Sequence, residues 1–244
     1  MAHFLLVHGA WHGAWCWRDV TEALIRAGHR AHAVTLTGVG ERAHLLSPEI
    51  TLQTHIQDVM QAIEHEEMHQ VILAVHSYAG MIGTGVVDRM LDRIGHLVYV
   101  DAVVPKPGEA WGGTHSRATQ ESRLKAAQAS PDYAFPPPGA SLFGLDGPQA
   151  DWVNRRQTPH PAKPYTEPLD FSIERVASVP RTFVSCTQPS LATIDAIRPR
   201  VTDPRFWDGQ WLPGARVIEM ATGHDPMVSD PDGLTQILLS CAQP

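Results

Sequence analysis

The sequence has few cysteines, no long apolar run and no cluster of basic residues, and each absence argues against a class of protein. No apolar stretch approaches the roughly 20 residues that a membrane-spanning helix needs. The start, MAHFLLVHGAWHG, has no basic leader and only the short apolar run FLLV, so we do not expect a signal peptide. Acidic and basic residues are dispersed at a formal net charge of −7, which argues against nucleic-acid and membrane partners.

Only three cysteines are present, Cys16, Cys186 and Cys241, and their wide spacing forms no pairing pattern. An odd, scattered set argues against a disulfide framework and for a reducing compartment, so we expect a cytoplasmic protein. The length of 244 residues, with 43% hydrophobic residues, suits a single domain over residues 1–244. A homodimer is one option that the sequence leaves open.

Nucleotide and metal signatures are also missing. The stretch TGVGERAH, residues 37–44, lacks the remaining glycine of a dinucleotide loop, and no phosphate-binding G-K-[ST] motif is present. Residues 65–69, HEEMH, match a zinc signature, but they straddle the polar end of an expected helix and have no evident third ligand. A solvated helix end explains them better, and we predict no cofactor and no metal.

What is present is an alternation of apolar strands and amphipathic helices. Strand patterns cover residues 3–8, 29–36, 70–75, 96–104, 181–186 and 215–221, and helix patterns cover 17–28, 51–66, 79–91 and 231–242. Strands that alternate with helices predict parallel strands joined by crossover helices. We therefore predict an α/β fold with a doubly wound, mostly parallel sheet.

The alternation breaks between the two halves of this core, residues 1–104 and 180–244. Residues 105–179 are rich in proline and glycine and too long for a simple loop, so we expect a helical lid inserted over one end of the sheet. Its aromatic side chains are possible pocket walls, although each is individually more typical of lid packing: Trp111, Tyr133, Phe135, Phe143 and Trp152.

Three polar residues fall at the carboxyl ends of expected strands, in the order Ser77, Asp101, His224. This is the order of the catalytic triad in α/β hydrolases, in which a histidine base activates the serine and a carboxylate orients the histidine. The serine lies in VILAVHSYAG, where Val75 and Ala79 replace the glycines of the G-x-S-x-G turn. An ordinary serine after a buried strand is the alternative.

The carboxylate of the triad and the oxyanion hole are predicted from residues that directly follow expected strands. Asp101 ends the strand after the nucleophile helix, and Asp195 is the alternative acid. The loop HGAWHGAW, residues 8–15, follows the first strand. We expect the backbone N–H groups of Ala10 and Tyr78 to stabilise a developing oxyanion.

Four stretches together carry a family resemblance: FLLVHGAWHGAWCWRDV, HSYAG, LVYVDAVVP and GHDPMV. They resemble the α/β-hydrolase superfamily, and within it the plant-type methylesterase and hydroxynitrile-lyase group with its bacterial esterase relatives. The resemblance implies Ser77 as nucleophile, His224 as base and the Ala10 and Tyr78 amides as oxyanion hole. Most relatives carry the acid in a stretch like CTED. Here the stretch is CTQP, which moves the role to Asp101 by analogy with other α/β hydrolases.

The same resemblance separates esterase from lyase chemistry. Hydroxynitrile lyases of the group place a threonine after the first-strand histidine and a lysine after the catalytic histidine. This chain has Gly9 and Asp225 there, and a carboxylate would repel a departing cyanide, so we do not expect cyanogenic lyase activity.

We therefore expect a serine hydrolase that cleaves a small hydrophobic or aromatic carboxylic ester through an acyl-enzyme. Trp11, Trp111 and Met227 are the candidate pocket residues. Two alternatives stay open. One is lactone, amide or thioester hydrolysis, or carbon–carbon lyase chemistry, on the same triad. The other is a non-catalytic protein that binds a small ligand.

Overall fold

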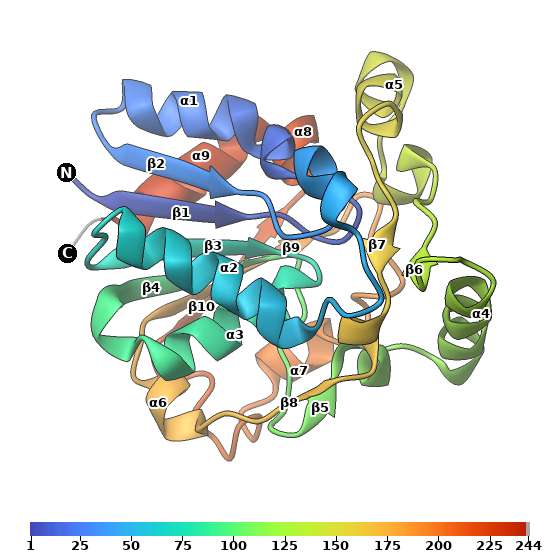
Figure 1. The fold of residues 1–244 in the computed structure, drawn as a ribbon. Coiled ribbons are helices and arrows are strands. Elements are labelled where there is room, and N and C mark those ends of the chain that lie inside the picture. The colour runs from blue at the N-terminus through green and yellow to red at the C-terminus, as the bar shows by residue number, and fades with distance from the viewer. Residues whose placement is uncertain (243–244) are drawn as a thin grey trace.

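A six-stranded parallel sheet forms the centre of the computed structural model, which describes residues 1–242 (Figure 1). The strand order is β10-β9-β4-β3-β1-β2, and every neighbouring pair is parallel. The strands are β1 (His3–Val7), β2 (Arg30–Val34), β3 (Val71–His76), β4 (Ile94–Val100), β9 (Arg181–Cys186) and β10 (Ala215–Met220). The predicted doubly wound α/β sheet is confirmed.

Helices cover both faces of the sheet because its strands are apolar on both sides. Side chains alternate along a strand, so Phe4 and Leu6 of β1 join one hydrophobic cluster while Leu5 and Val7 join another. The helices α1 (Arg18–Arg26) and α9 (Pro231–Ser240) cover the first face, and α2 (Leu52–His65) and α3 (Ala79–Arg89) cover the second (Figure 1).

The helix α2 shows how the sequence sets an element's limits. Thr51 and Thr54 form a reciprocal capping box that satisfies free N–H groups at the start. The apolar stripe seen in the sequence is buried against the sheet at Leu52, Ile56, Val59 and Ile63. The helix ends at His65, so the HEEMH stretch leaves the helix after its first residue. Its two histidines therefore do not share a helical face.

Most of the segment between β4 and β9 lies beyond the carboxyl ends of the strands, and its last part returns past α3 to the amino end of β9 (Figure 1). The segment contains helices, as the sequence predicts: α4 (Arg117–Gln128), α5 (Gly147–Asn154) and α6 (Ile173–Ala177). It also contains two antiparallel pairs of short strands, β5 (Glu109–Ala110) with β8 (Pro168–Leu169) and β6 (Ala134–Phe135) with β7 (His160–Pro161).

A second long connection, residues 187–214 between β9 and β10, holds α7 (Arg198–Thr202), and α8 (Pro226–Ser229) precedes α9. Short 3₁₀ turns occur at Ala14–Trp17, Gly40–Leu45, Leu91–Arg93, Trp111–Thr114, Ala140–Phe143 and Lys163–Tyr165. Among residues 1–242, none of the helices combines the length and the apolar character that crossing a bilayer requires.

Candidate active site

Ser77 occupies a sharp turn between β3 and α3. Its backbone φ is +55°, a left-handed conformation that is uncommon for a residue other than glycine. Backbone hydrogen bonds hold the turn: the Ser77 N–H donates to Val100 O at 3.2 Å, and Ser77 O accepts from the N–H of Val103 at 2.9 Å. A serine presented on a strained strand-to-helix turn is the geometry of a nucleophile elbow.

Val75 and Ala79 stand where the G-x-S-x-G motif has glycines, and two glycines of α3 provide the space instead. A Cβ at Gly83 would lie 2.7 Å from Val75 Cγ1, and a Cβ at Gly80 would lie 1.9 Å from Val103 O. Strand and helix therefore approach closely because glycines of α3 face the bulky Val75 and the neighbouring backbone. The G-x-S-x-G pattern looks for small residues only beside the serine, so it misses this arrangement.

Ser77, His224 and Asp101 form one hydrogen-bonded chain. The Ser77 hydroxyl lies 2.9 Å from His224 Nε2, and His224 Nδ1 lies 2.7 Å from Asp101 Oδ2. His224 and Asp101 are buried, and Ser77 is partly exposed. With Nδ1–H donating to the carboxylate, Nε2 is left as the acceptor for the serine proton. The three residues that the sequence proposed as a triad are thus brought together.

Asp101 is also held from its other side. Its Oδ1 accepts hydrogen bonds from the Cys186 N–H at 3.1 Å and from Arg198 Nη2 at 2.9 Å. Asp195, the alternative acid, pairs with Arg198 Nη1 at 2.5 Å and its side chain is 54% exposed. Asp101 is the carboxylate that contacts His224, and Asp195 contacts Arg198. No sequence motif pointed to Arg198.

The loop after β1 has the features expected of an oxyanion loop. Within residues 1–242, neither the Ala10 nor the Tyr78 backbone N–H donates a hydrogen bond. A Cβ at Gly9 would lie 2.8 Å from Ser77 Cβ, so only glycine fits beside the serine. Trp11 has a φ of +66°, which marks a sharp turn of this loop. Both predicted amides are therefore free to receive an oxyanion.

A cavity of about 240 Å³ opens onto Ser77 and His224. Its other lining residues are Trp11, Trp111, His115, Arg123, Leu142, Phe143, Ser190, Leu191, Ala192, Thr193 and Ile194. The cavity thus includes Trp11 and Trp111, two of the three residues predicted to line it. Residues 190–194 of the second long connection also line it, and no pattern in the sequence pointed to them.

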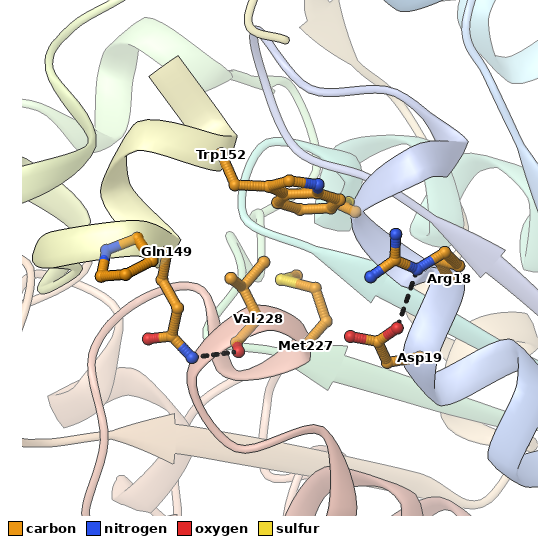
Figure 2. A pocket seen from close by; sticks show the side chains of 8 residues that line it. Arg18, Asp19, Gln149, Trp152, Met227 and Val228 are labelled. Atoms are coloured by element: carbon orange, nitrogen blue, oxygen red, sulfur yellow. Dashed lines mark hydrogen bonds and ion pairs between the residues drawn. The ribbon is translucent and has the colours of Figure 1, made fainter. Parts of the chain in front are cut away.

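The expectation that Met227 lines this cavity is wrong. Met227 is the second residue of α8 and packs into the cluster of Phe4 and Leu6. It lines a separate groove of about 230 Å³ together with Trp152, as Figure 2 shows. Neither Ser77 nor His224 borders that groove. The short helix after His224 turns the following side chains away from the serine, which a linear motif does not reveal.

A second buried histidine–carboxylate pair lies beside the first, and sequence reasoning missed it. His12 Nε2 is 2.9 Å from Asp225 Oδ2, and His12 Nδ1 is 2.8 Å from Ala10 O. Burial lowers the pKa of His12, but the Asp225 carboxylate outweighs it and the pKa is raised. Burial raises the pKa of Asp225, but His12 outweighs it and the pKa is lowered. Because both ring nitrogens of His12 face acceptor oxygens, both donate only when the ring is protonated, and the contact is an ion pair.

Two of these residues, together with the neighbouring His76, place possible metal-ligand atoms close to one another. Atoms of His76, His224 and Asp225 lie within 4.8 Å of one another. Each residue is already engaged: His224 with Ser77 and Asp101, Asp225 with His12, and His76 Nε2 with the backbone O of His224 at 2.9 Å. A metal would have to displace the serine–histidine–aspartate bonds, so this donor set fits a proton-transfer site better.

Fold and site together define a hydrolase of the α/β class. A family model described as the alpha/beta hydrolase family matches residues 4–237, and the chain belongs to this family. The carbendazim hydrolyzing esterase of Nocardioides sp. is 39% identical over 257 residues, 98% of each chain. Methylesterase 3 of Arabidopsis thaliana is 28% identical and covers 98% of this chain and 95% of that protein. The predicted resemblance to methylesterases and bacterial esterases is confirmed.

Solved structures agree in fold. An extracellular alpha/beta-hydrolase from a Paenibacillus species superposes with a TM-score of 0.81 at 21% identity, covering 99% of both chains. The methylesterase MES16 from Arabidopsis superposes with a TM-score of 0.75 at 22% identity, again over 99% of both. At these identities the likeness establishes the fold.

Proposed function

We propose that the protein is a serine esterase that cleaves small hydrophobic or aromatic carboxylic esters. The observation that carries the proposal is the continuous hydrogen-bonded chain from Ser77 through His224 to Asp101. The names of the relatives, an esterase and a methylesterase, support the same reaction. The strained serine turn and the adjoining cavity supply the presented nucleophile and the room for a substrate.

The reaction proceeds in two halves. His224 Nε2 takes the proton of Ser77 as its oxygen attacks the ester carbonyl, while Asp101 stabilises the imidazolium that forms. The N–H groups of Ala10 and Tyr78 donate to the tetrahedral oxyanion, and one such donor typically contributes about 10²–10³ in rate. His224 then protonates the leaving alcohol. In the second half it activates water to hydrolyse the acyl-enzyme.

Residues 105–179 act as a lid over this site. Trp111 and Phe143 from the lid and Trp11 from the core border the cavity and contribute apolar wall to it. A volume of about 240 Å³ is below the roughly 300–1,000 Å³ usual for drug-sized ligands. We therefore assign the site to small esters.

A reducing compartment such as the cytoplasm suits the chain's cysteines. Cys16, Cys186 and Cys241 are all unpaired and buried. Burial raises the pKa of the Cys186 thiol, which disfavours the reactive thiolate. Thiols held in this way need no disulfide partner to be stable.

Replacing the nucleophile tests the proposal. Ser77→Ala is expected to lower kcat for p-nitrophenyl acetate by about 10⁶-fold, as loss of a serine nucleophile does elsewhere, and to abolish labelling by a fluorophosphonate. Ser141→Ala, an exposed lid serine outside the cavity, is the matched control. Circular dichroism of both variants checks the fold. Retained turnover in folded Ser77→Ala would exclude the mechanism.

A substrate panel separates the esterase from other reactions of the same residues. Methyl and phenyl esters, a lactone, an amide and a thioester are compared by kcat/KM. Carbendazim belongs in the panel because the 39%-identical relative is named for hydrolysing it. The panel is expected to show highest kcat/KM for an ester. Labelling of Ser77 without turnover of any compound would favour the non-catalytic alternative.

A further inference from the structure

Arg123 of α4 is a largely buried cation in the wall of the cavity that contains Ser77. Its guanidinium carbon lies 5.2 Å from the ring centroids of both Trp11 and Trp111. The ring centroids of Phe135 and Tyr165 lie 5.9 and 5.6 Å from the same carbon. We call these four aromatic residues the cage of Arg123. The Arg123 Nη1 atom is fully buried and has no hydrogen-bond partner among residues 1–242.

No carboxylate accompanies this charge. Within the described residues Arg123 forms no ion pair, whereas the arginines Arg198 and Arg200 of the neighbouring connection both bind acids. A guanidinium stays protonated at neutral pH even when burial lowers its pKa, as it does here. Aromatic faces compensate a buried cation only in part, because they supply no acceptor atom for its N–H groups.

The titratable side chains around Arg123 are neutral. Burial, reinforced by the charge of Arg123, lowers the pKa of His115 to about 3. Burial likewise places the pKa of His160 well below its usual value and raises that of Tyr165. At neutral pH the cage therefore presents one uncompensated positive charge to the catalytic cavity, in a chain whose formal net charge is −7.

We propose that Arg123 binds an anionic carboxylate at the far end of a small hydrophobic ester, so that a half-ester of a small dicarboxylic acid is preferred over its uncharged diester. The proposal rests on the esterase function argued above. A carboxylate supplies the missing acceptors, and its two oxygens match the planar fork of a guanidinium. Since the cavity has a volume of only about 240 Å³, the carboxylate and the ester are separated by a short spacer.

The first experiment compares monomethyl glutarate with dimethyl glutarate by methanol release. We expect kcat/KM of the wild type to be at least about 10-fold higher for the half-ester. Arg123→Met is expected to lower kcat/KM for the half-ester by about 10–100-fold, the range for losing hydrogen bonds to a charged group. The kcat/KM for the dimethyl ester is expected to fall much less, so the ratio of the two kcat/KM values approaches one. Arg123→Lys, which keeps the charge, retains part of the preference.

The matched control is Arg117→Met, on the same helix. The Arg117 side chain is 92% exposed and pairs with Glu121, so the variant removes an equal charge from α4 without touching the cage. It is expected to keep the wild-type ratio. A wild type that favours the dimethyl ester, or an Arg123→Met variant that loses both substrates equally, overturns the proposal. Equal losses would mean that Arg123 only supports the packing of its cage.

The second experiment measures binding without turnover. In Ser77→Ala, quenching of the fluorescence of the cage tryptophans gives Kd for both glutarate esters. We expect the half-ester to bind at least about 10-fold more tightly, and Ser77→Ala/Arg123→Met to lose that difference. Equal affinities overturn the proposal whatever the catalytic activity. Labelling of wild-type Ser77 by a fluorophosphonate tests the esterase function separately, so the two failures are distinguishable.

Discussion

Two buried histidine–carboxylate pairs lie next to each other, and only one of them reaches a serine. His224 meets Asp101 at 2.7 Å, and His12 meets Asp225 at 2.9 Å. His224 and Asp225 are consecutive in the chain, yet each pairs with a residue from a different loop: His224 with Asp101, and Asp225 with His12. Burial and distance do not distinguish the pairs. The difference lies in what the second nitrogen of each ring faces.

The partner of the second nitrogen distinguishes the two rings. His12 Nδ1 faces the carbonyl of Ala10 and Nε2 faces Asp225, so both nitrogens donate and the ring is an imidazolium. His224 Nε2 instead faces the Ser77 hydroxyl, which can give a proton. A histidine–aspartate contact therefore does not by itself identify a base. An acceptor oxygen at the second nitrogen makes the His12 contact a structural ion pair, and a hydroxyl at that place gives His224 the geometry of the proposed base.

The structural pair still serves the site. His12 links the Ala10 carbonyl, in the loop proposed to hold the oxyanion, to Asp225, the residue after His224. The ion pair thus fixes the oxyanion loop against the histidine loop. Its loss is expected to act on stability and geometry together, whereas loss of Asp101 is expected to act on chemistry.

Removing Asp101, the carboxylate proposed to be catalytic, should have the largest effect of the changes to the two pairs. Asp101→Asn is expected to lower kcat for an ester by about 10⁴-fold, because an amide no longer enforces the tautomer that leaves Nε2 free. Asp195→Asn, which alters the same arginine contact from the exposed side, is the matched control and should change kcat by only a few fold. The reverse order of effects in steady-state kinetics would move the acid to Asp195.

Breaking the structural pair should have an intermediate effect. Asp225→Asn leaves a buried imidazolium without its counter-ion, and breaking such a pair typically costs about 3–5 kcal/mol in the free energy of unfolding. Urea denaturation measures this loss. Asp19→Asn, in the exposed pair with Arg18, is expected to cost less than about 1 kcal/mol. If the two variants proved equally stable, the 12–225 contact would not be an ion pair.

The sheet and the positions of Ser77, Asp101 and His224 were accessible from sequence because each depends on local pattern. Apolar periodicity locates the strands, and parallel strands bring their carboxyl ends to one edge. Polar residues at those ends therefore converge without knowledge of any contact. The family resemblance then added the expected chain order and the oxyanion loop.

The remaining features depend on contacts between distant residues. Arg198 meets Asp101 across 97 positions, and His12 meets Asp225 across 213; neither spacing has a motif. Met227 was misplaced because its side chain, on the short helix α8, packs into the cluster of Phe4 and Leu6 instead of the cavity. Gly83 compensates Val75 from the facing helix. Each case needs the packing of elements, which periodicity alone does not supply.

The smallest expected effect is the pH dependence of the structural pair. The folded pKa of His12 is raised above 6.5, so its stabilisation is complete below that pH and is lost as pH rises through the raised value. The folded pKa of Asp225 is lowered below 3.8, so its stabilisation is present above 3.8 and is lost as pH falls through the lowered value. The pair therefore stabilises the fold most between about pH 4 and 6.5.

His12→Gln makes this window measurable, because glutamine keeps hydrogen bonding but carries no charge. The free energy of unfolding of the wild type minus that of His12→Gln should be largest in the window and shrink above it, by about 1.4 kcal/mol for each unit by which the pKa is raised. His76, whose pKa burial holds well below its usual value, is common to both proteins and largely cancels in the difference. A difference that grows from pH 6 to pH 9 would mean that His12 is neutral, and the contrast between the two histidines would then rest on the serine alone.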